Sequence, residues 1–118
     1  METIIIQKLK RSVASEIELA EKYYAFLSSL NGLNLAPREI QLVAFAAIKG
    51  NISNNNVREE FIKTYDSSEA TITNIICRLK KIKVIVKEGG KNKVNPQIVV
   101  DFKKDIILQI TLSHEEQV

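Results

Sequence analysis

The sequence contains little of several residue types, and each scarcity excludes a class of site. Its 118 residues include no tryptophan, one cysteine (Cys77) and one histidine (His114). One cysteine cannot close a disulfide within the chain, and with one histidine it cannot complete a structural zinc site. His114 lies four residues from the C-terminus, so a Ser-His-Asp or Cys-His catalytic set has no rigid place to form. We therefore expect no enzyme, no metal and no cofactor.

Long apolar runs, glycine and proline are also scarce. The longest apolar runs, such as 42–48, fall far below the roughly 20 residues that a membrane-spanning helix needs. Four glycines, two prolines and 45% hydrophobic residues are typical of a compact fold with regular secondary structure. The first residues lack the basic leader and the apolar stretch of a secretory signal. We therefore expect one compact, soluble, cytoplasmic unit without a membrane partner.

Two remaining patterns are poor candidates for catalysis or phosphate binding. Glu59 and Glu60 are adjacent carboxylates, but adjacent positions on a helix do not aim two side chains at one point. The Gly89-Gly90 pair is not followed by the Lys-Ser pair and the helix of a phosphate-binding loop, so a tight turn is the simpler interpretation. Neither pattern indicates an active site.

Positive charge is concentrated in one part of the chain. Up to Cys77 there are eight basic and nine acidic residues, whereas 78–104 holds nine basic and two acidic residues, a net charge of +7. A basic cluster on a small domain is typical of a protein that contacts phosphate backbones. The open alternative is a solvated, lysine-rich face.

Apolar residues recur with helical spacing in four segments. The first helix is expected to start at Ser12 or Ser15, because Ser15 opens an S-x-x-E capping pattern, and to end near Asn31. The second opens at Pro37, whose missing N–H is not needed in a first helical turn, and ends at Gly50.

The third helix is expected at 54–66 and the fourth at 67–83, after a serine cap. In the fourth, apolar residues with i, i+3, i+4, i+7 and i+10 spacing form one stripe: Ile72, Ile75, Ile76, Leu79 and Ile82. The opposite arc is small, polar and basic, and it holds Ala70, Thr73, Asn74, Cys77 and Lys81, flanked by Arg78 and Lys80. The helix therefore has one apolar and one basic face.

After Ile82 the apolar pattern changes from a helical to an extended period. Segments 84–87 and 93–94, with 97–100 further on, are rich in β-forming residues and flank the turn signal at 88–92, which predicts a β-hairpin with a basic tip. Apolar and polar residues then alternate, which predicts a half-buried C-terminal strand over 105–113. Residues 3–9 are compatible with a strand or a helix start. Both end segments are candidates to pair with each other or across a dimer.

Three short helices followed by a hairpin resemble a winged helix-turn-helix domain. Residues 71–85, TITNIICRLKKIKVI, resemble the T-v-x-x-x-i-x-x-L-x-x-x-G-l-I passage of winged-helix regulators and of plasmid and phage replication initiators. Lys83 replaces the glycine that ends this helix in a left-handed conformation, so we expect a different helix end here. The resemblance covers about 35–100. It implies an α+β, mainly α fold with an extra N-terminal helix and a C-terminal strand.

A partial likeness to another family lies upstream. Residues 35–40, LAPREI, followed by 50–54, GNISN, look like the opening of a LuxR-type helix-turn-helix. The spacing onward to Thr71 is longer than in that family, which also lacks the hairpin. We therefore interpret the likeness as a three-helix arrangement that unrelated families share, and not as membership of the LuxR family. The expected organisation is an N-terminal strand and helix extension at 1–34, a winged-helix domain at 35–104, and a C-terminal strand and tail at 105–118.

In the winged-helix family the third helix of the motif enters the major groove, and the wing touches adjoining backbone or the minor groove. Base contacts are implied for Thr73, Asn74 and Lys81, with Ser68 as a further candidate, because asparagine pairs with adenine and lysine donates to guanine. Contacts to phosphates are implied for Arg78, Lys80, Lys87, Lys91 and Lys93. Such contacts position the protein on the duplex but do not read the base sequence. An ordinary solvated helix face is the alternative for Thr73 and Asn74.

The resemblance and the charge together favour a non-enzymatic protein that binds double-stranded DNA. It would act as a transcriptional regulator or as a phage or plasmid replication factor, in the nucleoid or, for a viral protein, in the host cytoplasm. A homodimer or higher oligomer is expected because two copies read two half-sites. The alternative is a phage structural, assembly or packaging protein of the virion, in which the winged helix holds protein partners.

Overall fold

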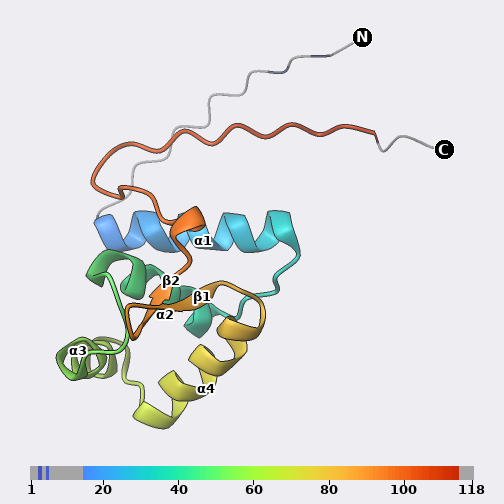
Figure 1. The fold of residues 1–118 in the computed structure, drawn as a ribbon. Helices are drawn as coiled ribbons and strands as arrows, with labels where there is room; N and C mark the ends of the chain where they lie inside the picture. The colour runs from blue at the N-terminus through green and yellow to red at the C-terminus, as the bar shows by residue number, and fades with distance from the viewer. Residues whose placement is uncertain (1–2, 4, 6–14, 115–118) are drawn as a thin grey trace.

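The computed structural model describes residues 3, 5 and 15–114, which form a mainly helical α+β fold with one two-stranded sheet (Figure 1). The elements are α1 (Glu16–Asn31), α2 (Pro37–Lys49), α3 (Asn55–Tyr65), α4 (Glu69–Lys81), β1 (Ile85–Glu88), β2 (Lys91–Val94) and a short 3₁₀ helix at Pro96–Ile98. The four expected helices and the expected hairpin are confirmed, but the β-rich segment 97–100 is not a strand, because the chain turns through the 3₁₀ helix there. The prediction for 3–9 lies almost wholly outside the described residues.

Local signals set the ends of the helices. The hydroxyl of Ser15 accepts a hydrogen bond from the amide of Glu18 at 3.2 Å, which caps the start of α1 as predicted. Pro37 occupies the first position of α2, where its missing N–H leaves no bond unmade. Gly32 and Gly50 follow α1 and α2 with positive φ, the backbone conformation that ends a helix and that glycine adopts without strain.

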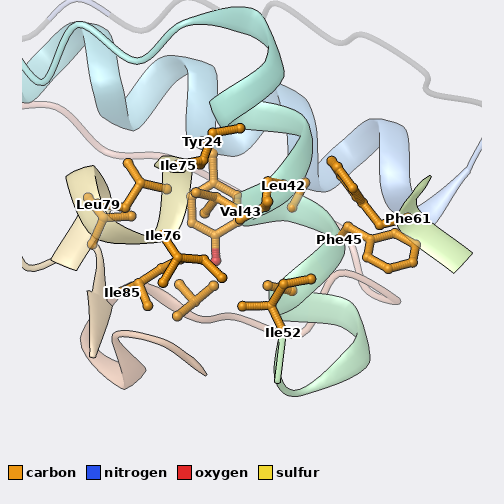
Figure 2. Close-up of a cluster of buried hydrophobic side chains, with 14 of the residues drawn as sticks. Tyr24, Leu42, Val43, Phe45, Ile52, Phe61, Ile75, Ile76, Leu79 and Ile85 are labelled. Atoms are coloured by element: carbon orange, nitrogen blue, oxygen red, sulfur yellow. The ribbon is translucent and has the colours of Figure 1, made fainter. Parts of the chain in front are cut away.

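The core draws on all four helices and on the hairpin (Figure 2). Its largest fully buried side chains are Tyr24, Leu42, Val43, Ile52, Phe61, Ile72, Leu79 and Ile85. Each fully buried aliphatic or aromatic side chain contributes about 1.5–3 kcal/mol relative to exposure. Because α4 and both strands of the hairpin contribute buried residues to this core, the helix and hairpin that carry the basic residues are held by one packed interior.

The chain after the hairpin folds back over α1 (Figure 1). The hydroxyl of Tyr24 donates to the carbonyl oxygen of Ile98 at 2.8 Å. Burial raises the pKa of Tyr24 well above its usual value and the nearby Tyr23 adds to the shift, so the phenol stays protonated as a donor. Phe102 then packs against both tyrosines, with ring centroids 5.6 and 5.7 Å apart. Helix α1 and residues 98–102 therefore share one core.

The predicted C-terminal strand over 105–113 is wrong for the isolated chain. Residues 103–114 contain no strand, and no residue of 105–114 makes a backbone hydrogen bond to another described residue. A strand needs a neighbour to complete its ladder of hydrogen bonds. One edge of β2 is already used by Ile52, whose amide donates to the carbonyl oxygen of Asn92 at 2.9 Å. The alternating pattern is thus present without a partner strand among the described residues.

The expectation of a different end for α4 is also wrong. Lys83 has a φ of 64°, the left-handed conformation that commonly ends a helix and that is usual for glycine. The amide of Val84 donates to the carbonyl of Leu79 at 3.0 Å, and the amide of Lys83 to that of Lys80 at 3.2 Å. These two bonds complete a Schellman motif, and Asn95 Nδ2 donates to the Lys83 carbonyl at 3.1 Å. The surrounding bonds therefore impose the conformation on a lysine.

Replacing Lys83 with glycine is expected to raise the free energy of unfolding by about 0.5–1 kcal/mol. Glycine removes the steric cost of a left-handed Cβ, which exceeds the entropy that it adds to the unfolded chain. Urea unfolding followed by circular dichroism measures the change. Lys83→Ala is the matched control, because it removes the same long side chain but keeps Cβ. Equal stabilisation by both variants would contradict a left-handed strain at residue 83.

Candidate nucleic-acid interface

Helix α4 presents the two faces that its sequence pattern predicts. Ile72, Ile75, Ile76 and Leu79 are buried against the core. The exposed residues of the helix are Glu69, Ala70, Thr73, Asn74, Cys77, Arg78, Lys80 and Lys81. The candidates Thr73, Asn74 and Lys81 therefore lie on the solvent side of one helix, as expected.

Ser68 has a structural task at the start of α4. Its Oγ accepts a hydrogen bond from the amide of Thr71 at 3.2 Å, and its hydroxyl donates to the Thr71 hydroxyl oxygen at 3.0 Å. This cap satisfies an amide that the first turn of a helix leaves unpaired. A base contact through the Ser68 hydroxyl would compete with the cap.

Arg78 is held by partners within the protein. Its Nη1 donates to Oε2 of Glu39 at 2.8 Å, and its Nη2 donates to the carbonyl of Asn34 at 3.4 Å. The Glu39 side chain is only 9% exposed, and its other oxygen accepts from the amide of Ala36 at 2.7 Å. A carboxylate removed from water needs such partners because its desolvation is costly. Arg78 therefore joins α4 to the start of α2, in competition with the predicted phosphate contact.

Sequence reasoning missed Glu39 as the residue that holds Arg78. A partial signal existed, because Glu39 is the third residue of a helix that opens with proline, where a carboxylate often returns to the first amides. That signal explains the bond to the amide of Ala36. The pairing of Glu39 with Arg78, 39 positions later, depends on how α2 and α4 pack. Helical spacing alone does not specify that packing.

The hairpin turns on Gly89 and Gly90, with φ values of 59° and 77°. A two-residue turn with two positive φ angles matches the twist of antiparallel strands, and glycine adopts both without strain. The turn interpretation of this glycine pair is confirmed.

The hairpin does not bring its three predicted lysines to one face. Lys87 pairs with Asn92 across the hairpin and shares its face with the buried Ile85, whereas Lys91 and Lys93 belong to the other face. Lys87 and Lys91 are exposed, and Lys93 is half-buried. The hairpin therefore carries cations on both sides near its tip.

Hydrogen bonds fix the hairpin to the helices. The amide of Asn92 donates to the hydroxyl of Ser53 at 2.7 Å, and its carbonyl accepts from the amide of Ile52. The Asn95 amide donates to the carbonyl of Val84 at 2.8 Å, at the other end of the hairpin. The loop before α3 and the end of α4 thus hold the hairpin, so its lysines have a fixed place relative to α4.

The ion pairs leave most of the basic cluster uncompensated. Those between described residues join Lys49 to Glu60, Arg58 to Glu69, Arg78 to Glu39 and, at 4.0 Å, Lys93 to Glu88. None involves the lysines that we call the open lysine set: Lys80, Lys81, Lys83, Lys87 and Lys91. All five are exposed, and they lie on the second half of α4, its cap and the hairpin. Their charges sum to a local positive potential that attracts polyanions.

A further surface feature lies on α3. An open hollow of about 460 Å³ is lined by Asn56, Glu59, Glu60, Ile62 and Lys63 on α3. Both glutamates line it. Both are exposed to solvent and Glu60 pairs with Lys49, so the hollow holds no buried carboxylate pair. Within the described ranges, no three side chains of His, Cys, Asp or Glu gather as metal ligands.

No protein-family model matches the chain, and neither a curated protein nor a solved structure matches it. The assignment of a function therefore rests on the residues and geometry described above. No helix in the described part of the chain has the length and apolar character needed to cross a membrane.

Proposed function

We propose that this chain is a non-enzymatic winged-helix protein that binds double-stranded DNA through α4 and the hairpin. The observation that carries the proposal is the open lysine set, because these exposed cations lie on two adjoining elements and have no ion-pair partner among the described residues. Neutralising phosphates with such lysines releases counterions and supplies most non-specific affinity for DNA. In a cell it would serve as a transcriptional regulator or as a phage or plasmid replication factor.

The shape of α4 supports binding in a major groove. A groove about 12 Å wide admits one α-helix, and small side chains on the leading face allow close approach. Thr73, Asn74 and Cys77 provide such a face, with Lys81 one turn further along. Asn74 is suited to a bidentate contact with adenine, and Lys81 to the acceptors of guanine. The hairpin lysines would then contact phosphates beside the groove.

The direct test is binding of a labelled random-sequence duplex over a salt series. We expect the logarithm of the binding constant to fall with the logarithm of salt concentration, with a slope steeper than about −3, because several phosphates are neutralised. Lys81→Glu combined with Lys91→Glu should make the slope shallower by about 2 and weaken binding at low salt at least about tenfold. Both residues are exposed and neither has an ion pair with another described residue, so the fold should be retained.

The matched control is Lys22→Glu combined with Lys63→Glu. It changes the net charge equally, but Lys22 lies on α1 and Lys63 on α3, outside the open lysine set. The control should bind DNA nearly as the unmodified protein does. Equal loss in both double variants would show that net charge, and not this surface, determines binding.

The second candidate function is the virion structural or assembly protein, and the exposed apolar segment 105–113 favours it. In that role the protein would form a large discrete oligomer and would not bind duplex DNA at low salt. Light scattering on the protein used for the salt series distinguishes the two functions.

A further inference from the structure

The last described residues form an extended segment whose apolar side chains are mostly exposed, although Ile106 is half-buried and packs against the core. We call residues 105–114 the C-terminal arm, and Figure 1 shows it leaving the body of the molecule beyond α1. Between Asp105 and His114 it carries no charged residue. Ile107 is 93% and Leu112 91% exposed, while Leu108 and Ile110 are each 47% exposed. Contiguous apolar surface of this kind on a soluble protein marks an interaction site.

The backbone of the arm makes no hydrogen bond to another described residue. An extended chain with free N–H and C=O groups and alternating apolar residues is a template for another strand. A partner that completes the ladder therefore satisfies both the backbone and the apolar face.

The charges at the two ends of the arm select a second copy of the chain as this partner. Lys103 and Lys104 precede the arm, and the sequence continues after it with Glu115 and Glu116. Antiparallel pairing of two arms brings the basic end of one copy beside the acidic end of the other. Parallel pairing would bring like charges together, which is unfavourable across a strand pair.

The apolar pattern then selects the register. Residues with even numbers, Ile106, Leu108, Ile110 and Leu112, share one face of an extended arm. Antiparallel pairing around Gln109 sets Ile106 opposite Leu112 of the second copy and Leu108 opposite its Ile110, so every even residue meets an apolar one. A shift by one residue mixes the apolar face with Ser113, Thr111 and Gln109. A shift by two sets Ile106 opposite His114.

We propose that the chain forms a two-fold symmetric dimer in which two C-terminal arms pair antiparallel, with Gln109 opposite Gln109 of the second copy. A two-stranded ribbon alone is only marginally stable, so its apolar face needs further cover. Phe26 and Leu30 on α1 are 47% and 54% exposed, and Phe26 lies two positions from the buried Tyr24 and Ser28, on the side of α1 turned away from the core. The ribbon packs its even-numbered face on these side chains. The dimer does not depend on DNA binding.

Sedimentation equilibrium of the full chain tests the interface. The unmodified protein is expected to be a dimer, and Leu108→Lys to weaken the dimer about 100-fold, because two-fold symmetry applies the loss of a buried leucine twice. Ile107→Lys is the matched control, since Ile107 is more exposed but belongs to the outward face. It should leave the dimer intact. A monomeric unmodified protein, or equal loss in both variants, would overturn the proposal.

A disulfide tests the register. In a background with Cys77→Ser, Gln109→Cys should form a covalent dimer on mild oxidation, because directly opposed strand residues have Cα atoms about 4.5–5.5 Å apart, within disulfide range. Thr111→Cys lies on the same face, but its two copies would be about 13 Å apart along the strands, so it should remain reduced. Covalent dimer from Thr111→Cys and none from Gln109→Cys would overturn the register.

Discussion

Arg78→Glu is expected to lower the free energy of unfolding by about 4 kcal/mol, which is a large part of the 5–15 kcal/mol that stabilises a typical domain. The variant removes the only side-chain partner that the structure gives the Glu39 carboxylate and sets a second carboxylate against it. Glu39 cannot turn to water without releasing the amide of Ala36 at the start of α2. Urea unfolding followed by circular dichroism measures the loss.

Lys81→Glu is the matched control for Arg78→Glu. It makes the same change of charge three residues later on α4, but Lys81 is exposed and has no ion pair among the described residues. Its effect on stability should stay within about 0.5 kcal/mol, as for most surface substitutions. The opposite pattern, a stable Arg78→Glu that no longer binds DNA, would show that Arg78 contacts phosphate and that its pair with Glu39 is dispensable. The two variants thus separate support of α4 from contact with DNA.

The elements of the fold followed from the sequence because each helix carries its own boundary signals. Ser15, Pro37 and Ser68 mark three helix starts, and all three act within a few residues of their own position. The buried face of α4 followed from helical spacing for the same reason. Local rules therefore sufficed where the determining contacts are local.

The errors occurred where a distant contact decides the outcome. Lys83 adopts a glycine-like conformation because bonds from Val84 and Asn95 hold it there. The alternation over 105–113 is typical of a strand. Such a pattern shows which side chains share one side of the strand, but it does not identify the strand that would pair with it. At the candidate site, the exposure of Thr73 and Asn74 could be predicted, whereas the engagement of Arg78 by Glu39 could not. Only the packing of α2 on α4 creates that pair.

Phe102→Ala is expected to lower the free energy of unfolding by about 3 kcal/mol. Phe102 is 4% exposed, and its ring packs against Tyr23 and Tyr24 on α1. Truncating a buried phenylalanine costs about 3–5 kcal/mol, and the lower value applies where the surrounding chain can relax into the cavity, as it can after the last regular element. Because the ring lies four residues beyond Ile98, its loss also weakens the hydrogen bond from Tyr24 to the Ile98 carbonyl.

The matched control for Phe102→Ala is Phe26→Ala, which truncates the same residue type on α1. Phe26 is 47% exposed, so its truncation should cost less than about 1 kcal/mol in the monomer. Unfolding of both variants should be measured at the same low protein concentration, where a dimer contributes little. A cost for Phe102→Ala no larger than that for Phe26→Ala would mean that residues 98–102 pack only loosely on α1. The expected difference would instead show that α1 and residues 98–102 share one core with α2, α4 and the hairpin. A fragment restricted to 35–98 would then lack packing that supports the proposed DNA-binding surface.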